Sequence, residues 1–255
     1  MTTLVVTRPR HEAERWRVAL EAAGWPVVLL PLIEIVPAPD AEALARCRER
    51  WASYDAVMFV SAQAVAHFLP QPVTSWPLRC WAPGPGTAST LQQAGVPVDR
   101  IDAPDPGAPQ FDSEALWARV REQVAPGHRL LVVRGCSEGR SEGQGNGRDW
   151  LAEQCRAAGG QVDWCVAYQR RCPVWGTATR AQAAALVQDH ACWLFSSSQA
   201  VGHLHQLCPD QRWEHARALV THPRIGASVR ELGFGEIIDS RPALADVLSH
   251  LESLH

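Results

Sequence analysis

The sequence has no apolar run long enough to cross a membrane. A membrane-spanning helix needs about 20 consecutive apolar residues, and even the apolar stretch at residues 25–36 is broken by Pro26, Pro31 and Glu34. The first ten residues also lack the basic start, the apolar centre and the cleavage site of a secretory signal. From these absences we expect a cytoplasmic protein without a membrane partner.

The sequence also lacks the cysteine and histidine spacings of a metal site. Its eight cysteines include no C-x-x-C pair, which argues against a zinc site or a disulfide framework and favours buried, reduced thiols. The ten histidines include no H-E-x-x-H motif, and His203 and His205 stand two residues apart on an expected helix, where they do not face each other. We therefore expect no metal.

A basic excess is missing as well. The formal net charge is −3 and the isoelectric point is about 6.4, which argues against a general nucleic-acid binder. The 255 residues are 46% hydrophobic and 20% charged, a composition typical of globular proteins. A chain of this length can bury one large core or two modest ones.

One ten-residue segment occurs twice in similar form. Residues 59–68 (FVSAQAVAHF) and 195–204 (FSSSQAVGHL) are identical at six of ten positions. Weaker matches in the same order pair residues 5–8 with 131–134, 22–27 with 157–162, and 87–89 with 226–228. Self-similarity in a constant order indicates two copies of one structural unit.

Each copy has the pattern of an α/β protein. Short, continuous apolar strands such as residues 56–60 and 192–195 alternate with helices, which indicates a parallel sheet buried on both faces. In the first copy we expect strands at residues 3–7, 27–35, 56–60 and 79–82, and helices at 12–23, 63–69 and 87–94. Gly24, Gly95, Gly159 and Gly233 each follow an expected helix and are predicted to cap its C-terminus.

Two segments at matching points of the copies, residues 34–39 and 169–174, are rich in proline or arginine and are predicted to be linkers. If the chain crosses between domains twice, one domain contains both chain ends and the other contains the middle of the chain. The corresponding boundaries are 1–35 with 174–255 for the first domain, 40–168 for the second, and 36–39 and 169–173 for the linkers. The residue pattern alone leaves two tandem domains open.

Polar and glycine-containing turns follow the expected strands. In an open parallel sheet, ligands bind at the carboxyl ends of the strands, where helix N-termini present free N–H groups and a partial positive charge. This arrangement predicts a site for a polyanion. Its candidate residues are Thr7, Arg8, Ser61, Ala62, Gln63, Gly84, Thr87, Arg134, Ser196, Ser197, Ser198, Gln199 and Ile225.

Several of these candidates have a purely structural alternative. Ser61 and Ser197 could each cap only their own helix, although one serine can cap a helix while the next N–H groups bind a ligand. Arginines are usually solvated surface groups, but Arg8 and Arg134 occupy equivalent positions in the two copies. That equivalence sets them apart from ordinary surface arginines, and a role in binding and a surface role both stay open.

Two further features are weaker. The glycines of the loop that begins at Gly84 do not complete a dinucleotide fingerprint, because Ser89 stands where the third glycine would be. Tyr168 is one of only two tyrosines and stands at an expected strand end beside Arg170 and Arg171. Packing in the core or the linker is the structural alternative for this tyrosine.

A set of short motifs, in this order and spacing, resembles the uroporphyrinogen-III synthase family from end to end of the chain. The matching segments are residues 6–9, 54–65, 84–88, 112–116, 158–162 leading to Tyr168, 195–197 and 222–225. Each motif is short and degenerate. Their common order is what makes the resemblance specific.

The resemblance implies two similar doubly wound, parallel-sheet (flavodoxin-like) domains, joined by a two-stranded linker and enclosing the active site in a cleft. It implies a cyclising hydro-lyase that converts hydroxymethylbilane, a linear tetrapyrrole with eight carboxylates, into uroporphyrinogen III with inversion of the last ring and loss of water. In the accepted scheme, loss of the hydroxyl gives an azafulvene cation, which forms a spiro intermediate and then recloses correctly. No cofactor is implied, and we expect a monomer that acts on this small molecule.

Residue by residue, the resemblance implies that Tyr168 assists departure of the hydroxyl, either directly or through water. Ser61, Thr87 and Ser197 match substrate-lining positions, whereas Ser198, Gln199 and Ile225 are implied to contribute mainly backbone N–H groups. Two departures put detailed carboxylate contacts in question. Gly226 stands where many members have threonine, and the glycine-rich stretch at residues 137–147 is longer than usual.

Two other classes of protein share parts of this pattern. A non-catalytic two-domain binder for a small polyanion would also have double crossings, but the absence of an export signal argues against the periplasmic type. A nucleotide-sugar transferase would have two doubly wound domains, but the chain is short for that class and has no convincing diphosphate-sugar motif.

Overall fold

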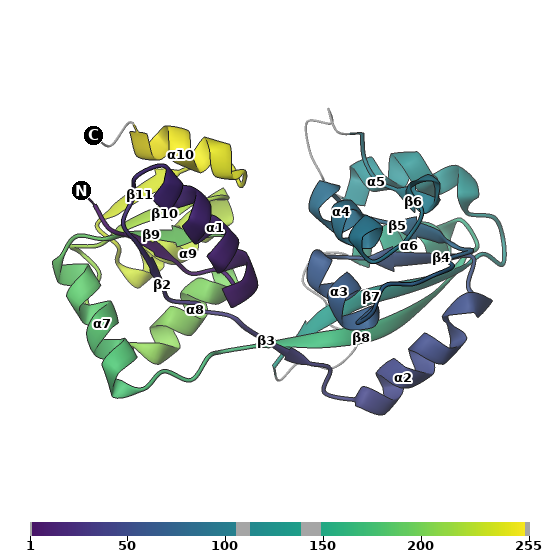
Figure 1. Ribbon diagram of the computed structural model, residues 1–255, viewed down its shortest axis with the longest axis horizontal. Coiled ribbons are helices and arrows are strands. Elements are labelled where there is room, and N and C mark those ends of the chain that lie inside the picture. Colours follow the sequence, from purple (N-terminus) through teal and green to yellow (C-terminus); the bar gives the residue numbers. More distant parts are fainter. Residues whose placement is uncertain (1, 106–112, 139–148, 253–255) are drawn as a thin grey trace. The chain divides into compact units, whose positions relative to one another are not determined.

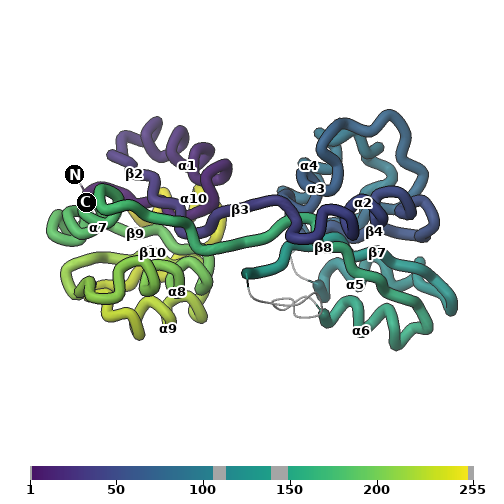
Figure 2. The backbone as a smooth tube through the Cα atoms, turned by 90° about the horizontal axis from the view of Figure 1, so that it is seen from below, coloured from purple at the N-terminus to yellow at the C-terminus, as the bar shows by residue number. Residues whose placement is uncertain are grey.

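Figure 1 shows the computed structural model of the chain, which describes residues 2–105, 113–138 and 149–252. The chain divides into two compact units. Unit 1 consists of Met1–Ile35 and Arg171–His255, and unit 2 consists of Val36–Arg170. Both chain ends therefore belong to unit 1, as the tube in Figure 2 shows, and the backbone passes between the units twice.

Unit 1 contains a five-stranded sheet in the order β11-β10-β9-β1-β2, in which every neighbouring pair is parallel. The strands are β1 (Leu4–Val6), β2 (Val27–Leu29), β9 (Cys192–Phe195), β10 (Arg217–Val220) and β11 (Glu236–Asp239). Its helices are α1 (Arg10–Ala22), α7 (Thr177–Gln188), α8 (Ser198–Leu207), α9 (Pro223–Leu232) and α10 (Leu244–Glu252).

Helices cover both faces of the unit 1 sheet. Because side chains alternate along a strand, Val5 packs into a cluster with residues of α7, α8 and α9, whereas Leu4 and Val6 pack into a second cluster with residues of α1 and α10. Figure 1 shows α1 and α10 together on one side of this sheet. All three residues of β1 are completely buried, which accounts for the continuous apolar strands of the sequence.

Unit 2 contains a six-stranded sheet in the order β3-β8-β7-β4-β5-β6, in which the pairs from β8 to β6 are parallel. The strands are β3 (Glu34–Pro37), β4 (Ala56–Phe59), β5 (Arg79–Trp81), β6 (Ile101–Asp102), β7 (Arg129–Ser137) and β8 (Gln161–Arg171). The α-helices are α2 (Ala41–Arg50), α3 (Ala62–Phe68), α4 (Pro85–Gln93), α5 (Ser113–Val120) and α6 (Asp149–Ala157). Short 3-10 turns occur at Trp51–Ser53, Val98–Arg100 and Arg121–Gln123.

The two sheets are built in the same way from exchanged halves of the sequence repeat. The order β2-β1-β9-β10-β11 in unit 1 corresponds to β8-β7-β4-β5-β6 in unit 2. Each sheet therefore joins the first two strands of one copy to the later strands of the other, as β1 pairs with β9 and β7 pairs with β4. In both units this is the doubly wound order known from flavodoxin-like folds, so the α/β fold class expected from the sequence is confirmed.

The structure corrects one expected strand. Residues 27–35 do not form a single strand, because β2 ends at Leu29 and β3 begins at Glu34 in the sheet of the other unit. Pro31 lies between them, and the N–H groups of Leu30 and Leu32 on either side of it still donate to the Val6 and Thr7 carbonyls at 3.1 and 3.0 Å. The chain nevertheless stays buried over this stretch, since Leu30, Leu32 and Ile33 belong to the unit 1 core.

The predicted helix ends are confirmed at the glycines. Gly24, Gly95, Gly159 and Gly233 have φ angles of +86° to +94°, a left-handed conformation that glycine adopts at little cost. Two other features of the sequence fall outside the described residues: Asp112, which opens one of the short motifs, and residues 139–147 of the glycine-rich stretch.

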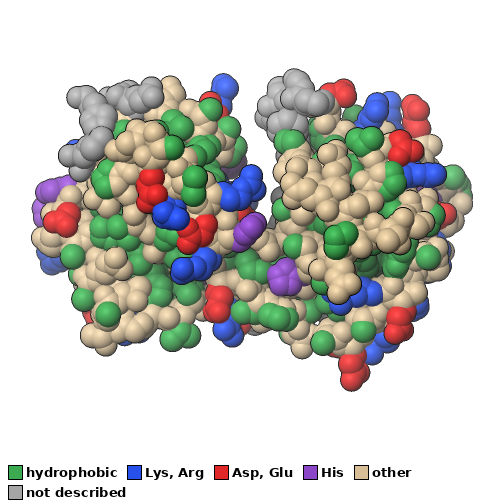
Figure 3. All heavy atoms as spheres, viewed as in Figure 1, with side chains coloured by type: hydrophobic (Ala, Val, Ile, Leu, Met, Phe, Trp, Pro, Cys, Tyr) green, Lys and Arg blue, Asp and Glu red, His purple; other side chains and the backbone are tan. Residues whose placement is uncertain are grey.

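The eight cysteines are free thiols, and five of them are buried (Cys80, Cys136, Cys155, Cys165 and Cys192). Burial raises the pKa of Cys155 and of Cys192 to about 12, so both remain protonated at neutral pH. On the face shown in Figure 3, acidic and basic side chains are interspersed. Among the described helices, none combines the length and the apolar character of a membrane span.

Candidate active site

Tyr168 lies near the end of β8, where the pairing of β8 with β7 is irregular. Arg134 is opposite Val166, but the next residue, Gly135, is opposite Tyr168, so that β8 contains one extra residue at Ala167. Such a bulge bends a strand and redirects a side chain. The Tyr168 side chain is buried, with only 4% of the residue exposed.

Gly135 makes room for the Tyr168 ring. A Cβ atom at position 135 would lie 2.5 Å from Cε2 and 2.8 Å from Cε1 of Tyr168, and as close to Cζ between them. Because the three ring atoms are about equally near, the glycine faces the flat side of the ring and not its edge. Any larger residue would displace the ring, since carbon atoms in contact are about 3.5–4.0 Å apart.

Ser61 connects this tyrosine to the turn between β4 and α3. The Ser61 Oγ lies 3.2 Å from the Tyr168 hydroxyl and also accepts a hydrogen bond from the Ala64 N–H at 3.2 Å. Ser61 is thus the N-cap of α3, as the structural alternative predicted, and it also contacts the candidate catalytic group. Ala62 and Gln63 are the first two residues of this helix, and their N–H groups have no partner within it.

His67, in the last turn of α3, stacks on Tyr168 with ring centroids 5.5 Å apart and an interplanar angle of 30°. Arg48 donates to the carbonyl oxygens of His67 and Phe68. Burial, followed by repulsion from Arg48, lowers the pKa of His67. A cavity of about 300 Å³ lies beside this histidine, and its lining includes Arg48 and Ala167.

The next turn of unit 2 leads from β5 to α4. Gly84 is the N-cap of α4, Pro85 occupies the first helical turn, and Thr87 is buried with 7% exposure. Helix α4 packs against α3. Both turns lie at the carboxyl edge of the sheet, because β4 and β5 are parallel neighbours.

Arg134 is not at a strand end, contrary to the expectation from the sequence. It lies within β7, which continues to Ser137 because β8 continues to pair with it beyond the bulge. Its guanidinium stacks over Trp164 at 3.9 Å and forms an ion pair with Asp149 at 3.4 Å. Only 6% of Arg134 is exposed, so these contacts occupy the guanidinium inside unit 2.

In unit 1, Thr7 and Arg8 follow β1. The Thr7 hydroxyl donates to the Leu194 carbonyl at 2.7 Å, which ties the ends of β1 and β9 together. The Arg8 guanidinium forms an ion pair with Glu12 at 3.2 Å and lies 4.2 Å from the centre of the Trp16 ring. Burial lowers the pKa of Arg8, while Glu12 opposes that change.

Two helices of unit 1 begin at the same edge of the sheet. Ser197 caps α8 by accepting from the Gln199 N–H at 3.2 Å, with Ser196 before it and Ser198 after it. His222 caps α9 through its Nδ1, which accepts from the Arg224 N–H at 3.1 Å. The Ile225 N–H donates to the His222 carbonyl at 2.9 Å. The N–H groups of Gln199 and Ile225 therefore already have partners, whereas a role of Ser198 in binding a substrate stays a prediction.

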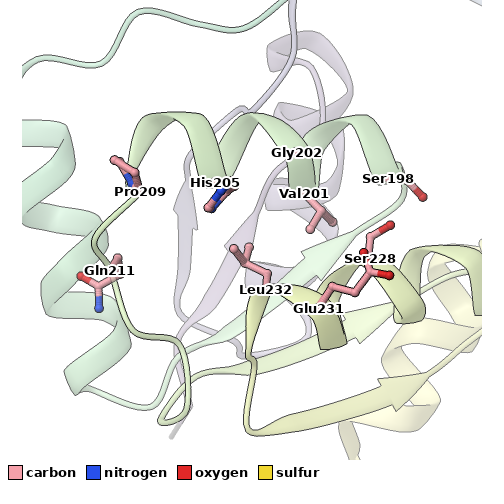
Figure 4. Close-up of a pocket in the computed structure, with 9 residues that line it drawn as sticks. All are labelled: Ser198, Val201, Gly202, His205, Pro209, Gln211, Ser228, Glu231 and Leu232. Atoms are coloured by element: carbon pink, nitrogen blue, oxygen red, sulfur yellow. The ribbon is translucent and has the colours of Figure 1, made fainter.

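A groove of about 420 Å³ runs along these two helices (Figure 4). Ser198 marks its end at the start of α8, and Ser228 and Glu231 line it from α9. Gly202 leaves space on the α8 side, since a Cβ there would meet nothing within 4 Å. Among the residues that the structure describes, no three histidines, cysteines or carboxylates are grouped so that they could hold a metal ion.

The structure thus brings Tyr168 and the Ser61 turn together in unit 2 and places Thr7, Arg8 and the Ser197 turn in unit 1. Two residues of the Tyr168 environment carried no prediction, namely His67 and Gly135. His67 is identical to His203 in the repeat, and this identity was the available signal. For Gly135 the signal was its place inside an apolar strand, because a glycine there often marks a point where another group comes close to the strand backbone.

The sequence matches known proteins over most of its length. Residues 14–249 match the family described as uroporphyrinogen-III synthase HemD (HEM4). The uroporphyrinogen-III synthase of Salmonella typhimurium is 29% identical over 249 residues, which cover 92% of this chain and 93% of the relative. That of Escherichia coli is 26% identical with the same coverage.

Solved structures show the same fold. The uroporphyrinogen-III synthetase of Helicobacter pylori superimposes with a TM-score of 0.60 at 15% identity, over 100% of both chains. A mutant uroporphyrinogen III synthase of Thermus thermophilus gives a TM-score of 0.53 at 14% identity, over 99% of this chain and 98% of the other. Since the family match spans nearly the whole sequence, the chain belongs to the uroporphyrinogen-III synthase family.

Proposed function

We propose that this chain cyclises hydroxymethylbilane to uroporphyrinogen III, with inversion of the last pyrrole ring and loss of water. It would thus be a cyclising lyase of tetrapyrrole biosynthesis. Family membership over residues 14–249 supports the reaction. The observation that carries the mechanism is the buried Tyr168 hydroxyl, held 3.2 Å from the Ser61 Oγ beside a helix N-terminus.

Tyr168 is the proposed proton donor to the departing hydroxyl. The Ser61 oxygen already accepts from the Ala64 N–H, so its own proton can be donated to the Tyr168 oxygen, leaving the phenol proton for the substrate. When the C–O bond breaks, its electron pair leaves with the oxygen, which takes the phenol proton and departs as water. The Ser61 hydroxyl then stabilises the negative charge that develops on Tyr168.

The azafulvene cation formed in this step needs orientation more than it needs a nucleophile. Closure at the substituted carbon of the last ring gives the spiro intermediate, and fragmentation followed by reclosure gives isomer III. The proton released at the final closure can restore the phenol, so the reaction balances with loss of one water. Unassisted closure gives isomer I, and positioning of the last ring is therefore the main contribution of the protein.

The substrate carboxylates require many hydrogen-bond donors. We propose that the first turns of α3, α4 and α8 supply backbone N–H groups for them, because helix N-termini favour anions. Arg8 is the proposed side-chain contact, although it must share its guanidinium with Glu12. The chain contains no lysine, so arginine is its source of permanent positive charge.

We further propose that the two units act as the two domains of a monomeric cytoplasmic enzyme that needs no cofactor. Each proposed group comes from this one chain, and all eight cysteines are free thiols, as is usual in a reducing compartment. Sedimentation or light scattering of the purified protein at assay concentration tests the monomer. A stable dimer would contradict it.

The test of the reaction is to incubate the purified protein with hydroxymethylbilane, oxidise the products and separate isomers I and III by chromatography. A large excess of isomer III over a protein-free control supports the proposal. Only isomer I would refute catalysis by this chain. If hydroxymethylbilane still bound, the alternative of a non-catalytic polyanion binder would then be favoured.

A further inference from the structure

The Tyr168 ring is held by residues outside its own strand, and this arrangement has a functional consequence. Building on the proposed function, we infer that His67 is a positioning residue: its ring holds the Tyr168 ring over Gly135 so that the phenol hydroxyl meets Ser61. His67 would not touch the reacting atoms. It would set the direction in which the phenol proton is offered.

Helix α3 presents both of the contacts that fix the tyrosine. Ser61 caps the helix and contacts the hydroxyl, while His67 lies in its last turn and stacks on the ring. Ser61 and His67 are six residues apart, about 9 Å along the helix axis, and their side chains reach the hydroxyl and the ring of Tyr168. One rigid element therefore fixes both ends of the aromatic side chain.

The sheet supplies the opposing surface. Gly135 faces the flat side of the ring with no side chain of its own, so the tyrosine can lie close to the backbone of β7. Helix α3 packs on β7. Consequently the ring is confined between a strand and a helix, and loss of the His67 ring would leave one side unsupported.

The C-terminal end of α3 is itself anchored. Arg48 of α2 donates through Nε to the Phe68 carbonyl at 3.0 Å and through Nη2 to the His67 carbonyl. Cations stabilise the last carbonyls of a helix. These two hydrogen bonds restrain the backbone that carries the stacked ring.

The surroundings of His67 favour the neutral ring. The cavity beside it is lined by Pro37, Ala38, Ala41, Leu44, Ala66, Pro70 and Ala167, together with Arg48 as its charged side chain. Tyr168 is the titratable group that faces His67 from β8. A neutral aromatic ring in this place acts by its shape. An aromatic residue without a titratable group, such as phenylalanine, should therefore be able to replace His67.

The decisive experiment is a double-mutant cycle with hydroxymethylbilane as substrate. We expect H67A to lower kcat about ten-fold with little change in KM, and H67F to retain kcat within about three-fold because the ring is kept. If His67 acts through Tyr168, the Y168F/H67A variant should be no slower than Y168F, since the effects of two coupled residues on kcat do not add. G135A, which crowds the same ring, should resemble H67A.

A matched control is H203A, which alters the equivalent histidine of the second copy. The His203 Nδ1 contacts the Leu32 carbonyl at 2.6 Å and lies in unit 1, so its loss should leave kcat unchanged in protein shown to be folded by circular dichroism. An effect of H67A that adds fully to that of Y168F would refute the inference. So would an H67F variant as slow as H67A. If instead Y168F itself had wild-type kcat, the proposed role of Tyr168 would fail before His67 was tested.

Discussion

The Tyr168 hydroxyl and the Ser61 Oγ lie 3.2 Å apart although 107 residues separate them in the sequence. The contact forms because β7 lies between β8 and β4 in the sheet, and because the bulge at Ala167 turns the tyrosine toward α3. Two groups from different copies of the repeat thus meet at one edge of unit 2. The contact therefore makes Tyr168 and Ser61 the first two residues to replace.

Replacing Tyr168 by phenylalanine should lower kcat about ten-fold or more, the lower range for loss of a positioned proton donor. The fold should persist, because the ring stays between Gly135 and His67. Steady-state kinetics with hydroxymethylbilane measures the effect, and a thermal melt checks the fold. A folded variant with unchanged kcat would remove Tyr168 from the mechanism.

Ser61→Ala should affect both stability and turnover. Loss of an N-cap costs about 1 kcal/mol, and loss of the phenol contact should lower kcat. Asp40→Ala is the matched control, since Asp40 caps α2 by accepting from the Ala43 N–H at 2.7 Å but has no place in the site. Urea unfolding and kinetics on both variants separate the two effects. Equal kcat values for them would show that Ser61 is only a cap.

Arg8→Ala should raise KM more than it lowers kcat, because it removes a proposed carboxylate contact and no reacting group. Arg17→Ala provides a control on α1, the helix that follows Arg8, where Arg17 is paired with Glu14 and Glu21. Initial rates over a range of hydroxymethylbilane concentrations give both constants. A KM equal to that of the wild type would exclude Arg8 as a substrate contact.

Arg134→Ala should lower the free energy of unfolding by about 2 kcal/mol or more, because it removes a buried cation that stacks on Trp164. It also leaves Asp149 without this partner. Denaturant unfolding measures the loss. If stability were unchanged while KM rose sharply, Arg134 would be a substrate contact after all, as its place in the repeat suggested.

Acidification should destabilise the protein through His67. Its pKa is lowered in the folded state by burial and by Arg48, so the unfolded chain takes up a proton at this residue at a higher pH than the folded chain does. Stability from this source is therefore complete above the ordinary histidine pKa near 6.5 and falls as the pH decreases through it. Unfolding at pH 7.5 and pH 5.5 should differ less for His67→Phe than for the wild type. An equal difference would contradict the assigned direction.

Much of the fold could be predicted because local patterns and the repeat agree. All residues of the apolar strands β4 and β9 are buried, and the helix-ending glycines have the positive φ that their positions required. The polar turns at Ser61 and Ser197 lie at helix N-termini, as the strand-turn-helix pattern indicated. Each of these features depends on residues close together in the sequence.

The roles of the arginines could not be predicted in the same way. Arg8 and Arg134 occupy equivalent repeat positions, yet one follows β1 while the other lies inside β7 and stacks on Trp164. The length of β7 depends on its pairing with β8, and a pairing across many residues has no local signal. Likewise, no role was predicted for His67, because its role depends on its contact with Tyr168, which is distant in the sequence.

The sequence by itself determined the α/β class, the two copies of the repeat, the four helix ends at glycines and the family resemblance, because all of these are written in periodicity and in short motifs. Only the tertiary structure decided which halves of the copies share a sheet, where β7 ends, and that Tyr168 lies over Gly135 between Ser61 and His67. The physical reason is that strand pairing, bulges and close ring contacts depend on packing between segments that are distant in the sequence. At Gly135, for example, the absence of a side chain is what makes room for the Tyr168 ring.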